Sequence, residues 1–351
     1  MRLGIISLGG PSSLALAESC RDFFERVDTL DIRDFDVRLT NDGSTIVYKG
    51  KTLEDYDCLV LRGSFRYALL QRAITRAYHD KVYMPAEPRA FTLAHDKFLT
   101  LVELQKQGIA IPKTHYAATT RLAKDILKKV HYPIIMKLQE GTHGKGVMVA
   151  ESEKSARTIL DMLDAFQKSY IIQEFVKTEK MSDIRAVVAG NKVIASYKRF
   201  ASDGEVRSNV HAGGKRERHK ITRVEEKLAI RAAKAVGAEI CGVDIFDSDR
   251  PSIIEINLSP SLHSINEVSD VNALEEISKY LFLQTVRFRK KKEEKIMKKI
   301  EKKKANKEIS KGEEIVTKIV EFPLAVDKII KRTLGLTTPQ TESSSEQRRL
   351  D

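Results

Sequence analysis

The residues best suited to chemistry are Asp244, Glu255 and Asn257, in the stretch GVDIFDSDRPSIIEINLSP. Two apolar, β-branched runs, GVDIF and IIEIN, flank Asp-Ser-Asp-Arg-Pro, which is typical of a hairpin turn. If the turn centres between Asp249 and Arg250, Asp244 lies directly opposite Glu255. Asn257 then shares the face of Glu255, because side chains alternate along a strand.

Two carboxylates and an amide oxygen on one face predict a site for a hard cation. Oxygen ligands without His or Cys suit Mg²⁺, and like charges placed opposite each other need something positive between them. A solvated hairpin face with an unrelated acidic pair would carry the same residues, so both interpretations stay open at this point. We expect amide replacement of Asp244 or Glu255 to leave the fold intact, since relieving an acidic cluster rarely unfolds a domain.

A second candidate is the glycine-containing segment KLQEGTHGKGV, residues 137–147. Lys137 ends a strand-like run, and Gly141, Gly144 and Gly146 allow backbone N–H groups to approach an anion closely. The segment lacks the GxxxxGK[ST] pattern of a P-loop. A flexible hairpin loop would look the same. A further lysine, Lys97, lies on the preceding helix, where a lone lysine is usually solvated.

Three weaker patterns follow along the chain. QEFV (Gln173–Val176) closes a strand and could offer backbone groups to a purine edge. A hairpin with its turn at Gly190 places Asp183 opposite Lys198, which a simple cross-strand ion pair would also explain. RSNVHAGG begins with Arg207, whose planar fork can bind a phosphate or carboxylate with two hydrogen bonds.

The elements that would position these residues alternate between strands and helices. An apolar run at LGIISL, a helix over about 13–26, further strands and a helix over Ala68–Tyr78 predict a small α/β domain. Helical spacing from Thr92 ends at Gly108, and a last helix covers about 270–285. We predict four parts: an N-terminal domain 1–91, a central lid 92–174, a C-terminal catalytic domain 175–286 and a basic tail 287–351.

Six segments, taken in chain order, resemble the ATP-grasp superfamily, and more closely its RimK-type glutamate ligases, over about residues 84–266. They are DKFLTLVELQKQGIAIPKT, KLQEGTHGKGV, QEFV, DIRAVVAGNKVIA, RSNVHAGG and GVDI…EINLSP. The resemblance implies an α/β ATP-grasp fold in which a central lid and a C-terminal α+β domain enclose ATP. It also implies nucleotide-binding residues, namely Lys97, Lys137, Gly141, Gly144, Gly146, Glu174, Phe175, Val176, Asp183, Arg207, Ser208 and Asn209. Catalysis would fall to Arg207 and Asn209. Asp244, Glu255 and Asn257 match the family's ligands for Mg²⁺ or Mn²⁺.

The chain departs from the family beside the reaction centre. After EINLSP the family usually has Gly and, two residues later, Glu, whereas this chain has Ser261 and His263. The identity of the substrate and the role of His263 are therefore left open.

Composition limits the other classes of function. The 351 residues carry a net charge of +12, of which residues 287–311 contribute +9, so the basic pI describes a tail. The three cysteines match no metal or disulfide spacing, and no apolar run approaches the length of about 20 residues that a membrane span needs. These features predict a cytoplasmic protein without a membrane partner.

The resemblance implies an ATP- and Mg²⁺-dependent carboxylate–amine ligase that forms an amide through an acyl phosphate. The expected substrates are an amino acid, glutamate first, and a carboxylate on a protein, peptide or coenzyme. One alternative is a ligase of amino-acid biosynthesis that acts on a carrier protein. Another is a nucleotide-binding protein without turnover that contacts RNA or the ribosome through its tail, although an exposed charged helix is favoured for this segment. Whether the chain forms a homo-oligomer is left open.

Overall fold

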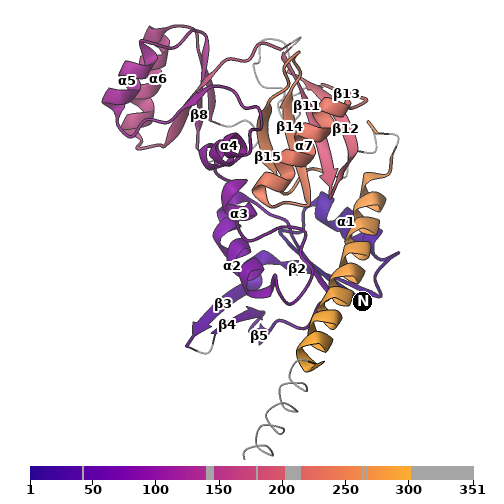
Figure 1. Ribbon diagram of the computed structural model, residues 1–351. Helices are drawn as coiled ribbons and strands as arrows, with labels where there is room; N and C mark the ends of the chain where they lie inside the picture. The colour runs from indigo at the N-terminus through magenta and orange to yellow at the C-terminus, as the bar shows by residue number, and fades with distance from the viewer. Residues whose placement is uncertain are drawn as a thin grey trace, which may run out of the picture. The chain divides into compact units, whose positions relative to one another are not determined.

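The computed structural model describes residues 1–41, 43–139, 146–178, 181–201, 215–262, 265, 268–269 and 271–301 (Figure 1). The chain divides into two compact units, Met1–Arg289 and Lys290–Asp351. Within the described ranges no helix is both long enough and apolar enough to cross a bilayer.

The N-terminal part is built on a parallel sheet in the order β2–β1–β6. A Cβ at Gly4 in the central strand would lie 2.7 Å from Leu59 Cδ2, so any larger residue here would force the buried Leu59 side chain to move. The helix predicted over 13–26 begins earlier, at Pro11, because proline has no N–H to lose and suits a first turn. It ends at Cys20, so it is also shorter than predicted. The elements of this part are β1 (Arg2–Ser7), α1 (Pro11–Cys20), β2 (Arg26–Asp31), η1 (Ile32–Asp34), β3 (Phe35–Thr40), β4 (Gly43–Tyr48), β5 (Lys51–Thr52), β6 (Cys58–Leu61), η2 (Phe65–Tyr67), α2 (Ala68–Tyr78) and α3 (Ala90–Leu93).

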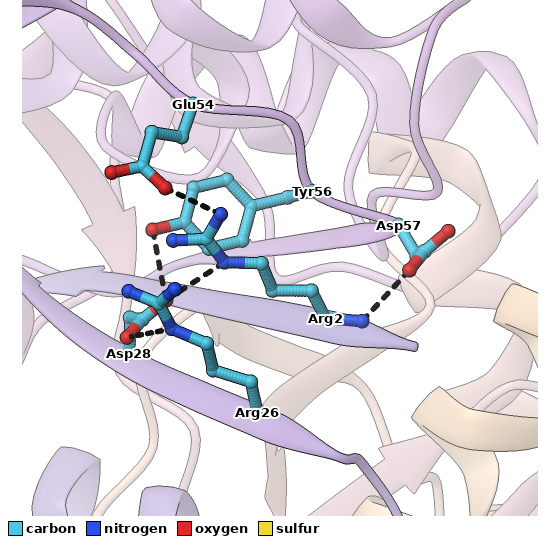
Figure 2. Close-up of polar contacts among 6 residues, drawn as sticks. All are labelled: Arg2, Arg26, Asp28, Glu54, Tyr56 and Asp57. Atoms are coloured by element: carbon cyan, nitrogen blue, oxygen red, sulfur yellow. Dashed lines mark hydrogen bonds and ion pairs between the residues drawn. The ribbon is translucent and has the colours of Figure 1, made fainter.

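A polar cluster around Arg2 connects the strands of this sheet (Figure 2). Arg2 on β1 contacts Asp28 on β2 at 3.1 Å and Glu54 at 2.6 Å, and its guanidinium lies 4.5 Å from the centre of the Tyr56 ring. The backbone N–H of Arg2 donates to Asp57 Oδ2 at 2.7 Å. These contacts join β1, β2 and the segment before β6, so the cluster has a structural role.

The lid consists of an antiparallel sheet in the order β7–β10–β8–β9 with two helices packed on it. Ser152 caps the second helix, as its side chain accepts from the N–H of Ser155. The apolar faces of the sheet and helices enclose a core of their own around Met136 and Leu160. The elements are α4 (Lys97–Lys106), β7 (Thr114–His115), α5 (Thr120–Leu127), β8 (Ile134–Leu138), β9 (Val147–Ala150), α6 (Glu153–Ala165) and β10 (Tyr170–Glu174).

A five-stranded antiparallel sheet follows, in the order β13–β12–β11–β14–β15. Alternate residues of β11, such as Ile184 and Ala186, pack with α7 in one core, whereas Asp183 and Arg185 point to the opposite face. That opposite face is therefore free to carry the charged residues. The elements are β11 (Ser182–Ala189), β12 (Lys192–Phe200), β13 (Lys215–Arg218), α7 (Arg223–Val236), β14 (Ile240–Phe246) and β15 (Ile253–Asn257).

The prediction that Asp183 lies opposite Lys198 is wrong by one residue. The turn at Gly190 is present, with φ +64°, but a β-bulge at Val187/Val188 shifts the register so that Asp183 lies opposite Arg199. Lys198 points to the other face and pairs with Asp247 at 2.8 Å. The extra residue of a bulge cannot be counted from a turn pattern alone.

The C-terminal helix covers residues 273–301, so the predicted boundary at 286 falls inside it. Within the first unit Phe288 lies 6.4 Å from Tyr83, ring centre to ring centre, and Arg289 lies 3.3 Å from Asp57. Both contacts lie beyond the predicted boundary.

We therefore expect a chain that ends at Arg289 to be more stable than one that ends at Thr285. The shorter chain loses the Phe288 ring contact and an exposed ion pair, a difference of about 1–2 kcal/mol. Urea denaturation of both chains measures this difference. Equal midpoints and equal slopes would show that these last residues contribute nothing to the first unit.

Candidate functional site

The charged face of the five-stranded sheet carries a row of side chains at matching positions. Strand pairing places Arg218 opposite Tyr197, Tyr197 opposite Arg185, Arg185 opposite Asp244, and Asp244 opposite Glu255. Residues that lie opposite each other in an antiparallel sheet share a face, so the row runs across all five strands. The predicted pairing of Asp244 with Glu255 is confirmed.

Two arginines hold Asp244 at the centre of this row. Arg185 Nε and Nη2 donate to Asp244 Oδ1 and Oδ2, each at 2.6 Å, and Arg199 Nη2 lies 2.7 Å from Oδ2. Burial by itself would raise the pKa of the Asp244 carboxyl, but the charges of Arg185 and then Arg199 outweigh it and lower that pKa. Arg199 also pairs with Asp183 at 2.6 Å.

The predicted metal ligands keep some capacity to bind a cation. The two guanidinium groups occupy three of the roughly four acceptor positions of the Asp244 carboxylate, which leaves one on Oδ1. The Asn257 Oδ1 accepts from the N–H of Ser259 at 2.8 Å and also keeps one lone pair. Glu255 is half-buried beside them. The residues therefore fit a hard cation, with Glu255 as the most available ligand.

No three His, Cys, Asp or Glu side chains gather as a metal cluster in the part of the chain that the structure describes. The predicted set contains only two carboxylates, so the amide of Asn257 and oxygens from a substrate would complete it.

Lys137 lies on β8 of the lid and is 8% exposed. Its Nζ donates to Gln173 Oε1 on β10 at 2.7 Å, and Gln173 Nε2 donates to Thr114 Oγ1 at 2.8 Å. Burial is the main reason that the Lys137 pKa falls to about 8; Glu255 opposes the fall and Lys97 adds to it. A buried ammonium that is poorly balanced by carboxylates is well placed to bind a phosphate.

A cavity of about 570 Å³ brings these residues together. Its volume lies in the range of about 300–1,000 Å³ that is usual for small-molecule sites. Both sides of the cavity carry predicted site residues, which are Lys97, Lys137, Phe175, Val176, Asp183, Asp244, Glu255 and Asn257. Lys97 is the first residue of α4, whose N-cap is Asp96.

The remaining predicted residues do not line this cavity or lie outside the described chain. The Glu174 side chain is exposed and accepts from the N–H of Lys113 at 2.8 Å, so only its backbone could serve a base at this strand end. Gly146 adopts φ +80° and lies against Leu138. The predictions for Gly141, Gly144, Arg207, Ser208, Asn209 and His263 fall on residues outside the described ranges.

Sequence reasoning missed Arg185, Arg199 and Arg62, which also line the cavity. A signal for Arg185 was present, because it follows Asp183 by two residues and must share its face. Arg199 required the bulge, and Arg62 in LVLRG follows a buried strand with no pattern to distinguish it.

The fold, with a lid sheet and a five-stranded sheet that line one cavity, is that of the ATP-grasp class. A family model, the RimK-like ATP-grasp domain, matches residues 94–281. The chain is 34% identical over 286 residues to a probable alpha-L-glutamate ligase of Maridesulfovibrio salexigens, a match that covers 80% of this chain and 95% of that relative. The chain belongs to the RimK-like ATP-grasp family, and it is a carboxylate–amine ligase.

Solved structures agree on the fold. An ATP-grasp RimK domain protein from Sphaerobacter thermophilus superposes with a TM-score of 0.63 at 15% identity, over 80% of this chain and 99% of that one. A D-alanine–D-alanine ligase from Bacillus anthracis in complex with ATP gives a TM-score of 0.59 at 15% identity, over 83% and 99%.

Amide replacements of Asp244 and Glu255 test the ion network by comparison with each other. The sequence predicted that Asp244→Asn leaves the fold intact, whereas the structure predicts a loss of stability. Asp244→Asn leaves the buried guanidinium of Arg185 without its counter-charge, and leaves Arg199 with Asp183 alone, so it should lower the free energy of unfolding by about 3–5 kcal/mol. Glu255→Gln has no such effect and should cost less than about 1 kcal/mol. Urea denaturation at pH 7 measures both. A similar cost for the two variants would contradict this account of the network.

The same network fixes the sign of the pH dependence. A carboxyl whose folded pKa is depressed contributes stability above its unfolded pKa of about 4, and loses it as the pH falls further. The Asp244→Asn variant should therefore lose less stability than the wild type when the pH falls from 5 to 3.

Lys137 should take up a proton when ATP binds. Its pKa of about 8 leaves much of it neutral at pH 8.5, and a bound phosphate favours the charged form. Calorimetry of ATP binding in buffers of different ionisation enthalpy should show this uptake at pH 8.5 but much less at pH 6.5. Lys137→Met should remove it, and Lys154→Met, at an exposed lysine of α6, should not. Equal uptake in wild type and Lys137→Met would exclude Lys137 as the proton acceptor.

Proposed function

We propose that this chain is an ATP- and Mg²⁺-dependent ligase that adds glutamate to a carboxylate of a protein, peptide or coenzyme. The observation that carries the proposal is the single cavity that holds both the desolvated Lys137 and the carboxylate Glu255. A cation site and a phosphate site in one cavity suit a nucleotide whose phosphates bind both. The names of the relatives, probable alpha-L-glutamate ligases, support glutamate as the amine.

The position of the described residues at the cavity supports the role proposed for each of them. Lys97 and Lys137 would neutralise phosphate charge, and Phe175 and Val176 would contact the adenine. Glu255 and Asn257, with one oxygen of Asp244, would hold Mg²⁺, which when bound offsets the charge of the phosphates. Arg207, Ser208 and Asn209, outside the described ranges, would serve the acyl site.

In the proposed reaction the acceptor carboxylate attacks the γ-phosphorus, ADP leaves, and an acyl phosphate forms. The amine of glutamate then displaces phosphate to give an amide. The protein would contribute orientation and fixed charges, which act without reorganisation in a site that excludes water.

ADP release with a panel of carboxylates, with and without L-glutamate, tests the proposal, and mass spectrometry should detect one added glutamyl residue. Glu255→Gln should reduce turnover by about a hundredfold or more at saturating Mg²⁺. Glu217→Gln is the matched control, because Glu217 is exposed on the other face of the same sheet, between Arg216 and Arg218. Turnover of Glu255→Gln within threefold of the wild type would refute the metal assignment.

A further inference from the structure

Arg62 is a buried cation that the nucleotide site does not explain. It follows β6 directly and is 5% exposed, yet among the described residues no carboxylate lies against it. Burial alone lowers the pKa of its guanidinium to about 10. An ion that is removed from water without a counter-charge is costly, so an anion that binds beside it would be favoured.

The other buried arginines of the cavity differ in this respect. Arg185 and Arg199 are both neutralised by Asp244, and Arg199 also by Asp183. These two already have their counter-ions within the sheet. Among the buried arginines that line the cavity in the described ranges, Arg62 is therefore the one whose positive charge is not neutralised by a carboxylate.

Hydrogen bonds orient Arg62 without using all of its donors. Nε donates to Ser13 Oγ at 3.2 Å and Nη2 donates to the Pro260 carbonyl at 2.7 Å. A guanidinium has five N–H donors in a planar fork, and the described residues accept from only two of them, which leaves Nη1 and one N–H of Nη2 for another acceptor. Arg62 also lines the 570 Å³ cavity.

The surroundings of Arg62 connect it to the reacting end of the cavity. The Gly63 N–H donates to Ser259 Oγ and the Leu262 N–H to Ser12 Oγ, each at 2.9 Å. These bonds join the start of α1 and the end of β6 to the loop that follows Asn257. Ser12, Ser13 and Ser64 line the cavity beside Arg62, and the first turn of α1 adds partial positive charge.

We propose that Arg62, together with Ser64 and the first turn of α1, binds a carboxylate of the substrate other than the one that is activated. This inference rests on the proposed function, which assigns the phosphates to Lys97 and Lys137 and the cation to Glu255. The planar fork of Arg62 matches a carboxylate, and a substrate with a second carboxylate would supply the missing counter-charge. That carboxylate belongs either to the incoming amino acid or to the acceptor.

A purely structural role for Arg62, in which it only holds the loop through Pro260, predicts different behaviour. The loop contact depends on a hydrogen-bond donor, whereas the proposed subsite depends on charge. Arg62→Gln keeps donors to Pro260 and removes the charge, so it separates the two roles.

Steady-state kinetics of the full chain should compare L-glutamate with L-glutamine and 4-aminobutyrate, which lack one carboxylate each. For Arg62→Gln we expect the KM of one carboxylate substrate to rise about tenfold to a hundredfold, with the KM of ATP within about twofold of wild type. If that substrate is glutamate, the wild type should prefer glutamate to one of the two analogues, and Arg62→Gln should lose that preference. If that substrate is the acceptor, the KM of glutamate should be the same in Arg62→Gln and the wild type. Arg66→Gln, at an exposed arginine nearby, is the control.

A change in kcat alone, or a parallel rise in the KM of ATP, would overturn the proposal. Thermal denaturation tests the subsite without turnover. L-glutamate or succinate should raise the melting temperature of the wild type and of Arg66→Gln more than sodium chloride of equal ionic strength does. Neither dicarboxylate should have this effect on Arg62→Gln. A wild type that is stabilised yet releases no ADP would contradict the proposed function and retain the subsite. If neither dicarboxylate stabilises the wild type beyond chloride, the subsite is refuted, even where Arg62→Gln does not fold.

Discussion

The ion network of Asp244 with Arg185 and Arg199 is the interaction on which the floor of the cavity depends. Three strands contribute to it, and all three side chains are buried, so Arg185 and Asp244 each need the other's charge, while Arg199 is neutralised by Asp244 and Asp183 together. The network also sets the charge that a ligand meets. One carboxylate of the row, Asp244, is largely neutralised, which leaves Glu255 as the main negative charge toward the cavity.

The lid and the floor present opposite charges to the same space. Lys137 extends from a sheet that encloses its own apolar core, and Gln173 holds its ammonium in place from the neighbouring strand. Because the lid core is separate from the cores beneath the five-stranded sheet, each layer can position its charged residue independently. A ligand that carries both phosphates and a cation would join the two layers.

The loop of residues 258–262 makes the N-terminal part a component of the site. It follows β15 directly and is hydrogen-bonded to Ser12, Arg62 and Gly63. Ser261, where the chain departs from its family, lines the cavity in this loop. This loop and Arg62, which has no carboxylate against it among the described residues, therefore lie together beside the cavity.

The sequence by itself determined what depends on local order. The period of two in GVDIF and IIEIN, with polar residues between, set the pairing of Asp244 with Glu255, and six segments in succession pointed to the family. Only the tertiary structure decided what depends on distant partners. A bulge shifted the register so that Arg199, and not Lys198, lies opposite Asp183. The carboxylate of Asp244 pairs with arginines on two other strands. Arg62 lies 198 residues from Pro260 along the chain, and it becomes buried, with no carboxylate against it in the described ranges, only once those segments pack together.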